Sequence, residues 1–473
     1  MPEHTLLSYR LEKTAGEPLY IQLCGRIQAD IVSGTLPPGS KLPSKRAFAA
    51  NLGVSLITVE SAYAQLRAEG FIEASPRRGY FVAGAVPPFP APKKEGAPFL
   101  QALPCPPPGL TDLSANAVYA PGFPYATWAK LMRRVLTQTD PNELVGRTPG
   151  KGVYALRLAV SRHLKDFSGI TADPEQIVLG AGTQVLYGLL IKLLGAQRVY
   201  AVEDPGYAEL AEIYRLSGAL LRRVPVDDKG VLPEALALSG ASVLHATPSH
   251  QFPTGAVMSA ERKMALLSWV RAKPGRHIIE DDYDSEFKLK GRPFAPLASM
   301  DAAGRVIYVN TFTKTLAPSL RVSYMVLPAS LALEFDKKLG FYASTVSTFE
   351  QFTLALFISG GYFARHILRM KKRYLEKRDL SLSLIREKNT LGKFKVLSPY
   401  DGLHFLLSVR TARSDRLLRE EIRKSGISVK FISDFEAGAT SDTHTLILSE
   451  AGLDEKTLRA GLGALLDILN RAA

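Results

Sequence analysis

Residues 310–321, with the sequence NTFTKTLAPSLR, hold a lysine flanked by hydroxyl side chains and an arginine seven positions further along. The amine of Lys314 can form a Schiff base with an aldehyde, and Thr311, Thr313 and Arg321 can share the charge of a phosphate. Pyridoxal phosphate (PLP) carries both groups, so the segment predicts a PLP site. A surface lysine in a loop is the alternative. It is the weaker interpretation because the lysine follows the strand-like run VIYV, and α/β sheets place ligands beyond the carboxyl ends of their strands.

A second chemical group occurs in residues 277–284, HIIEDDYD, where an apolar run leads into acidic residues. Side chains alternate along a strand, so we expect Asp281 and Tyr283 on one face and Asp282 on the other. A carboxylate beside a pyridine nitrogen keeps that ring protonated, and a phenol can hydrogen-bond to the ring hydroxyl O3′. An acidic strand end exposed to water would have the same sequence, so this segment alone leaves both interpretations open.

A third group is the segment GAGTQ at residues 180–184, which follows the apolar run IVL and precedes a helical pattern. Gly182, Thr183 and Gln184 would stand at the start of that helix, where backbone N–H groups favour a phosphate. Glycine turns of this kind are common, so this segment indicates a phosphate site only in combination with the other two groups.

Four β-branched runs alternate with long amphipathic stretches and predict the elements that carry these groups. The runs are IVL at 177–179, RVYAV at 198–202, HIIE at 277–280 and VIYV at 306–309. This alternation is typical of an α/β fold with a mostly parallel sheet covered by helices. We therefore expect the three groups to meet at one edge of that sheet.

The first 82 residues predict a different kind of unit. From residue 18 to about residue 32 an apolar residue recurs every fourth position, which indicates a helix that ends at Gly34. A Pro-Pro-Gly turn follows at 37–39. The apolar positions are Leu19, Leu23, Ile27 and Ile31.

Two shorter helices are expected next, joined at Gly53. Ser44 suits the N-cap of the first and Ser55 the N-cap of the second, which runs to about Glu69. Residues 71–82, FIEASPRRGYFV, then predict two short strands around a basic turn. This order is a helix-turn-helix with a wing, and its second helix would enter the major groove of DNA. The same arrangement can also serve packing alone, with the serines acting only as caps.

A proline-rich segment separates the two regions. Residues 83–108 contain nine prolines, which remove backbone donors and favour an extended tether. We therefore expect a DNA-binding domain over 1–82, a linker over 83–108 and a PLP-binding domain over 109–473.

Charge and composition limit the classes of function. The 473 residues carry a formal net charge of +14, but residues 1–82 hold nine Lys or Arg against seven Asp or Glu, so charge does not locate a DNA site. The basic run at 365–373 is expected to be the solvated face of a helix.

Only two cysteines occur, Cys24 and Cys105, so we expect neither a disulfide scaffold nor a metal site. No run of eighteen apolar residues and no signal core is present, so we expect a cytoplasmic protein without a membrane partner.

The ordered motifs over residues 18–82 resemble the winged helix of the GntR superfamily: helix, LPSKR, helix, VS, helix and wing. That resemblance implies binding to double-stranded operator DNA, with phosphate contacts that position the fold and one or two side chains that read bases. The DNA-binding residues that it implies are Ser44, Arg46, Ser55, Thr58, Arg77, Arg78 and Gly79.

The three chemical groups together resemble fold-type-I aminotransferases of class I/II over about residues 110–473, with a small C-terminal α+β subdomain from about residue 335. The resemblance implies that Lys314 is both the PLP anchor and the catalytic residue. It also identifies the segment EDPGY at 203–207 as the loop whose aromatic ring stacks on the cofactor. The PLP-binding residues that it implies are Gly182, Thr183, Gln184, Tyr207, Asp281, Tyr283, Thr311, Thr313, Lys314 and Arg321.

One segment departs from the family pattern. TPSHQFPTG at 247–255 takes the place of the family's Asn-Pro-Thr-Gly, and Phe252 stands where the asparagine that contacts O3′ is usual. His250 and Gln251 are the available substitutes, although a single histidine is more often structural.

A GntR-type domain joined by a proline-rich linker to an aminotransferase-like domain resembles the MocR subgroup of bacterial regulators. The resemblance implies a homodimer arranged head to tail, in which each DNA-binding domain crosses toward the partner's large domain.

Two functions stay open. The chain could be a transcription factor that senses a small-molecule effector, with PLP itself as one candidate, or an aminotransferase with a DNA-binding appendage. An aminotransferase normally holds the substrate carboxylate with an arginine late in the C-terminal subdomain, but the expected strand, TLILSE at 445–450, has none. Glu209 stands where some amino-acid-sensing members of the subgroup have an arginine. A charge-assisted contact is worth roughly 1.5–3 kcal/mol, so we expect a regulator whose transaminase activity is weak or vestigial. Lys430 or Arg410 could compensate, but the sequence does not place them.

Overall fold

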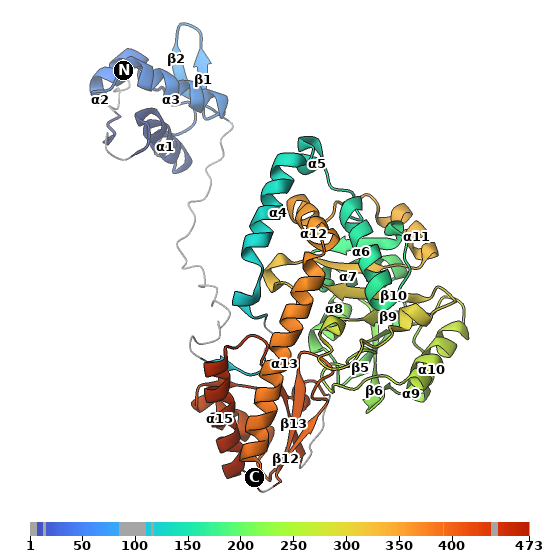
Figure 1. Cartoon of the computed structure of the whole chain (residues 1–473). Helices are drawn as coiled ribbons and strands as arrows, with labels where there is room; N and C mark the ends of the chain where they lie inside the picture. Colours follow the sequence, from blue (N-terminus) through green and yellow to red (C-terminus); the bar gives the residue numbers. More distant parts are fainter. Residues whose placement is uncertain are drawn as a thin grey trace. The chain divides into compact units, whose positions relative to one another are not determined.

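The computed structural model describes residues 7–12, 16–84, 110–114, 118–390, 392–436 and 443–472. It divides the chain into two compact units, Met1–Cys105 and Pro106–Ala473 (Figure 1). The segment expected to be a linker, 83–108, lies outside the described residues apart from its first two.

The N-terminal unit contains three helices and a two-stranded sheet. They are α1 (Leu19–Val32), α2 (Lys45–Leu52), α3 (Leu56–Ala68), β1 (Ile72–Ser75) and β2 (Gly79–Val82). The strands β1 and β2 are antiparallel neighbours, as expected for a wing. The order and the residue ranges of these helices and strands confirm the predicted helix-turn-helix with a wing.

Helix caps set the geometry of the two shorter helices. The Ser44 side chain accepts a hydrogen bond from the Ala47 N–H at the start of α2, and Ser55 accepts one from the Thr58 N–H at the start of α3. Gly53 has φ +64°, a conformation that glycine adopts without strain, and it ends α2 just before α3 begins. The predicted caps are therefore confirmed, and they fix the angle at which α3 leaves the turn.

An eight-stranded sheet forms the centre of the large unit (Figure 1). Its strands are β4 (Ile177–Gly180), β5 (Val199–Asp204), β6 (Leu220–Asp227), β7 (Gly230–Val231), β8 (Val243–Ala246), β9 (His277–Asp281), β10 (Val306–Thr311) and β11 (Ser323–Val326). They are arranged in the order β4-β11-β10-β9-β8-β5-β6-β7. The run from β10 to β6 is parallel, whereas β11 is antiparallel to both of its neighbours. The four predicted runs are β4, β5, β9 and β10, which confirms the mostly parallel α/β sheet.

Helices cover both faces of this sheet. They are α4 (Tyr125–Gln138), α5 (Pro141–Val145), α6 (Tyr154–Ser168), α7 (Thr183–Leu194), α8 (Ala208–Leu216), α9 (Pro233–Leu238), α10 (Ala260–Arg271), α11 (Ala329–Leu339) and α12 (Thr348–Ser359). Successive residues of β4 point into different cores. Ile177 and Leu179 pack in a cluster with residues of α6 and α12, whereas Val178 packs with residues of α7 and α11. The sheet is therefore buried on both sides, and its ligands must enter at a strand end.

The C-terminal part begins with the 27-residue helix α13 (Tyr362–Lys388) and continues into a second, four-stranded sheet. The basic run 365–373 lies in α13, where Ile367 and Met370 are buried and Leu368 is exposed, as expected for a helix with one solvated face. The remaining elements are β3 (Thr111–Asp112), β12 (Phe394–Leu397), β13 (Phe405–Arg410), α14 (Asp415–Lys424), β14 (Ile427–Ser428), β15 (Lys430–Phe431), β16 (Thr443–Leu448) and α15 (Glu455–Ala472).

This second sheet has the strand order β12-β13-β16-β15, and α14 and α15 pack on it. Short 3-10 helices occur at Ala120–Gly122, Pro174–Gln176, Ser285–Phe287, Leu297–Met300, Pro318–Leu320 and Ile432–Asp434. Within the described ranges, no helix is both long and apolar enough to cross a membrane.

A buried ion pair joins α13 to the end of the second sheet. The Arg378 Nε lies 2.6 Å from a carboxylate oxygen of Glu450, and both side chains are almost completely buried. The Arg378 guanidinium also donates to the backbone carbonyls of Pro399 and Gly402. Burial raises the pKa of Glu450, and Arg378 opposes that rise. The arginine thus stabilises the ionised form of a carboxylate that burial disfavours.

Replacing Arg378 with methionine should lower the free energy of unfolding of the large unit by about 3–5 kcal/mol, because Glu450 would be left buried without its partner. Urea unfolding followed by tryptophan fluorescence measures this, since the two tryptophans of the chain, Trp128 and Trp269, both lie in the large unit. The control is Arg386→Met on the exposed side of the same helix, with an expected change within about 0.5 kcal/mol. Equal effects of the two variants would contradict the compensating role of Arg378.

Candidate functional site

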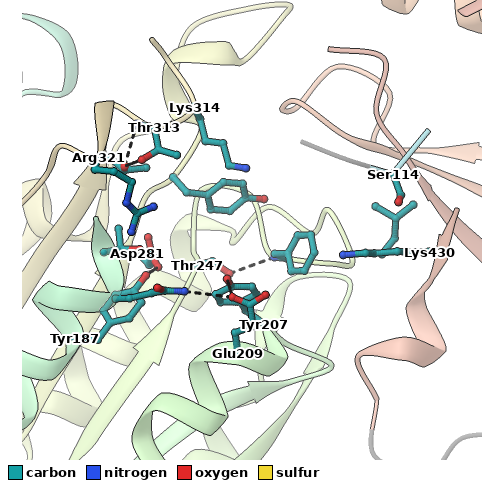
Figure 2. Close-up of a pocket in the computed structure, with 16 residues that line it drawn as sticks. Ser114, Tyr187, Tyr207, Glu209, Thr247, Asp281, Thr313, Lys314, Arg321 and Lys430 are labelled. Atoms are coloured by element: carbon teal, nitrogen blue, oxygen red, sulfur yellow. Dashed lines mark hydrogen bonds between the residues drawn. The ribbon is translucent and has the colours of Figure 1, made fainter. Parts of the chain in front are cut away.

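A cavity of about 350 Å³ lies at the carboxyl ends of β9 and β10 (Figure 2). Asp281 is the last residue of β9 and pairs with Val309 of β10, two residues before Thr311. Parallel strands end at the same edge of a sheet, which brings these groups together. The predicted site residues that line the cavity are Thr183, Gln184, Tyr207, Asp281, Tyr283, Thr311, Thr313, Lys314 and Arg321.

Lys314 lies in the connection between β10 and β11, and Figure 2 shows its amine directed into the cavity. Burial lowers the pKa of this amine. The Asp284 carboxylate acts in the opposite direction, and the ammonium of Lys430 lowers the pKa further. The environment therefore increases the fraction of the neutral amine, which is the nucleophilic form.

Asp281 presents one satisfied and one unsatisfied oxygen. The Tyr187 hydroxyl donates to Oδ2, and His245 Nε2 lies 3.5 Å from the same atom. Oδ1 is buried and, among the described residues, has no hydrogen-bond partner. A buried carboxylate oxygen without a donor is costly. The arrangement therefore favours a ligand that brings its own donor, such as a protonated ring nitrogen.

Asp282 turns away from the cavity, as the alternation along the strand predicts. Its Oδ2 accepts a hydrogen bond of 2.7 Å from the Tyr308 hydroxyl. Burial raises the pKa of Asp282 to about 8, and the carboxylates of Glu280 and Glu286 contribute to this rise. Asp282 is thus a buried structural group, whereas its neighbours Asp281 and Tyr283 face the cavity.

An anion cradle forms where α7 begins. Gly182 precedes α7 with φ +98°, and a Cβ at this position would collide with the guanidinium of Arg321. Arg321 itself has φ +51° and donates to the carbonyl of Ala181 at 3.2 Å. The Thr311 and Thr313 hydroxyls lie 2.8 Å apart on the same side. A helix N-terminus, a guanidinium and two hydroxyls at one point favour a phosphate.

Aromatic rings close the cavity on the opposite side. The rings of Tyr207 and Phe252 meet edge to face, 6.2 Å between centroids. The Tyr207 hydroxyl donates to Glu209, which follows in the first turn of α8. Phe252 lines the cavity, and its ring offers no hydrogen bond at the position where the resemblance implied an asparagine.

The two proposed substitutes for that asparagine do not line the cavity. His250 Nδ1 lies 3.2 Å from the Tyr283 hydroxyl and 3.0 Å from Asp284, so it contacts the cavity only through Tyr283. Gln251 uses its amide to hold Glu203 and two backbone carbonyls. Tyr283, the partner predicted for O3′, does line the cavity.

Several lining residues were not predicted. Lys430 and Ile447 come from the second sheet, and Ser114 follows β3, which pairs with β14 in a separate two-stranded sheet. Thr247 follows β8 of the large sheet, and Tyr187 lies in α7. No local pattern indicated Ser114 or Ile447, because their positions depend on pairing between distant segments. Lys430 had been named as a possible cation together with Arg410. Only Lys430 lines the cavity.

The N-terminal unit presents the predicted DNA-binding residues differently. Arg46, Arg77, Arg78 and Gly79 are exposed, whereas Thr58 is half-buried. The hydroxyls of Ser44 and Ser55 are already used as helix caps. The exposed first turn of α3 also carries Ile57, which is 72% exposed and was not predicted as a contact residue.

Two family models match the chain. The model described as bacterial regulatory proteins of the gntR family matches residues 19–82. The model for aminotransferase class I and II matches residues 108–465, which is more than half of the chain.

Relatives match over nearly the full length. The chain is 34% identical over 453 residues to the uncharacterized HTH-type transcriptional regulator YdeL of Bacillus subtilis, covering 96% of this chain and 97% of that protein. It is 31% identical over 477 residues to the probable rhizopine catabolism regulatory protein MocR of Rhizobium meliloti, covering 96% and 94%.

Solved structures match the large unit. LysN, an alpha-aminoadipate aminotransferase from Thermus thermophilus in complex with N-(5′-phosphopyridoxyl)-L-leucine, aligns with a TM-score of 0.67 and 23% identity over 77% of this chain and 93% of that one. At this identity the likeness shows the fold, which is that of PLP-dependent class I and II aminotransferases. With both family models and the full-length relatives in the same order, the chain belongs to the MocR subfamily of GntR-type transcriptional regulators.

Proposed function

We propose that this regulator holds PLP on Lys314, binds operator DNA through its N-terminal unit, and changes its DNA binding when a small effector enters the PLP pocket. The observation that carries the proposal is a buried oxygen of Asp281 without a partner among the described residues, in the same cavity as Lys314 and as Arg321, whose guanidinium lies against Gly182.

The residues of the cavity fit PLP in its chemistry. Asp281 would accept from the pyridine nitrogen, and Tyr283 would meet the ring hydroxyl. The cradle formed by Gly182, Thr183, Gln184, Thr311, Thr313 and Arg321 would hold the phosphate, and Tyr207 would cover the ring. PLP supplies an aldehyde and an electron-withdrawing ring, which the protein itself lacks.

Each side chain contributes a separate effect. Asp281 stabilises a proton on a ring nitrogen because an opposite charge favours the charged form. The lowered pKa of Lys314 keeps its amine available for the aldehyde. The two aromatic rings, Tyr207 and Phe252, limit access of water from their side.

On the DNA side, α3 is the proposed recognition helix. Arg46 and the wing-tip residues Arg77, Arg78 and Gly79 would contact phosphates or base edges. Because Ser44 and Ser55 cap their helices, their contribution is to present the N-terminal N–H groups of α2 and α3 to the backbone, with Thr58 beside them. The exposed Ile57 suits an apolar contact, such as the methyl group of thymine.

The organisation of the chain is part of the proposal. We propose domain boundaries at 1–82, 83–108 and 109–473, a C-terminal subdomain from about 335, and a head-to-tail homodimer. The protein would act in the cytoplasm, where its operator DNA lies. Effector binding would shift the arrangement of the two DNA-binding domains in the dimer.

An aminotransferase with a DNA-binding appendage is the second candidate, because Lys314 has the surroundings of a nucleophile. Rapid and complete transamination of common amino acids by the purified protein would favour that candidate. The regulator is preferred because relatives that match nearly the whole chain are named as transcriptional regulators, and because Ile447, not an arginine, lines the cavity from the strand where the substrate-binding arginine was expected.

Replacing Lys314 with alanine should abolish the visible absorption band of lysine-bound PLP while leaving DNA affinity largely intact. The reason is that the cofactor and DNA occupy different units. Absorbance of the PLP-treated protein and gel-shift binding to the DNA upstream of its own gene measure the two effects. Lys229→Ala, at an exposed turn outside the cavity, should keep the band. Loss of DNA binding together with the band would make PLP a folding requirement and not a signal.

Replacing Arg46 with alanine should weaken DNA binding roughly 10- to 100-fold, because one charge-assisted contact is lost. The PLP band should not change. The matched control is Arg67→Ala, an exposed arginine in the last turn of the recognition helix α3, whereas Arg46 lies in α2. A change in the PLP spectrum of Arg46→Ala, or equal DNA affinities of the two variants, would contradict the assignment.

A further inference from the structure

Two charged side chains of the cavity have no role in holding PLP. Of the charged residues that line it, Asp281, Lys314 and Arg321 are assigned to the cofactor, which leaves Glu209 and Lys430. Figure 2 shows that they stand on different walls, with Glu209 beside Tyr207 and Lys430 extending from the second sheet. Their charges are opposite, so the cavity offers one cation and one anion to whatever enters beside PLP.

Lys430 faces the cavity from β15. It is the Cα partner of Ile447 on β16, and both side chains line the same wall. Lys314 and Lys430 line the same cavity, and the Lys430 ammonium lowers the pKa of Lys314. The residue is exposed, and its ammonium stands 5.9 Å from the centre of the Phe435 ring. A ligand carboxylate next to Lys314 would therefore meet the Lys430 ammonium.

Glu209 lies in the first turn of α8, where the helix dipole favours a carboxylate. The Tyr207 hydroxyl and the Gln184 amide both donate to the same oxygen, Oε2. These two bonds hold the side chain at the cavity and leave Oε1 to accept from a ligand. The residue is exposed, so an incoming cation can reach it.

We propose that the effector is a diamino monocarboxylic acid whose carboxylate binds Lys430 and whose distal ammonium binds Glu209. This inference rests on the proposed function, since the amine beside the carboxylate faces PLP at Lys314. Because that amine is occupied at PLP, the group that pairs with Glu209 must be a second cation of the ligand. A dicarboxylic amino acid would bring a like charge to Glu209, and a neutral side chain would leave it unpaired. Lys430 and Glu209 thus favour a diamino monocarboxylic acid by attraction, and Glu209 disfavours a dicarboxylic amino acid by repulsion.

The test compares amino acids of similar shape. The full-length, PLP-loaded protein is titrated by calorimetry with L-ornithine, with L-norleucine, which replaces the distal ammonium by a methyl group, and with L-glutamate. Ornithine should bind roughly 10- to 100-fold more tightly than norleucine, as expected for one charge-assisted contact, and glutamate should bind least. Ornithine should also change the affinity for the upstream DNA.

Two variants assign the contacts. Glu209→Gln keeps an acceptor for Tyr207 and should reduce the preference for ornithine over norleucine to about one, whereas Glu212→Gln, one turn further along α8 and paired with Arg215, should keep it. Lys430→Met should weaken ornithine and norleucine to a similar extent, roughly 10-fold or more. The control Arg410→Met lies outside the cavity and should not.

The outcomes separate the two proposals. Absence of the visible band after addition of PLP would overturn the proposed function itself. If the band forms but ornithine binds no better than norleucine, or Glu209→Gln retains the preference, or Lys430→Met binds both like the original chain, the diamino effector is wrong while the PLP-binding regulator stands.

Discussion

A carboxylate buried at the end of a parallel strand is the constraint on which the site depends. Asp281 lies where β9 ends, with one oxygen held by Tyr187 and the other without a donor in the described part of the chain. Burial makes such a group unfavourable unless a proton donor arrives. The sheet places the anion cradle and Lys314 around the same space, so one flat ligand with a basic nitrogen, an aldehyde and a phosphate would satisfy all three at once.

The sequence was sufficient where the signal is local. The runs that become β4, β9 and β10 have a strand pattern, and ligand groups follow each of them, so the meeting of Gly182, Asp281 and Lys314 was predictable. The caps at Ser44 and Ser55 were predictable for the same reason. These elements are determined by residues within a few positions of one another.

The sequence was insufficient where distant segments meet. Lys430 and Ile447 are Cα partners although 17 positions separate them, and only their register decides which of two candidate cations, Lys430 or Arg410, enters the cavity. Ser114 joins from a segment before the large sheet. The substitutes suggested for the missing asparagine, His250 and Gln251, do not line the cavity for a similar reason. Other groups hold their side chains by hydrogen bonds, and the sequence does not place those groups.

This regulator carries an enzyme-like pocket, and its proposed function depends on PLP held on Lys314. Borohydride reduction of the PLP-treated protein fixes a lysine-bound cofactor, and mass spectrometry of the digested chain then locates it. We expect a phosphopyridoxyl group on the peptide that contains Lys314. A label on a different lysine, or no label at saturating PLP, would contradict it.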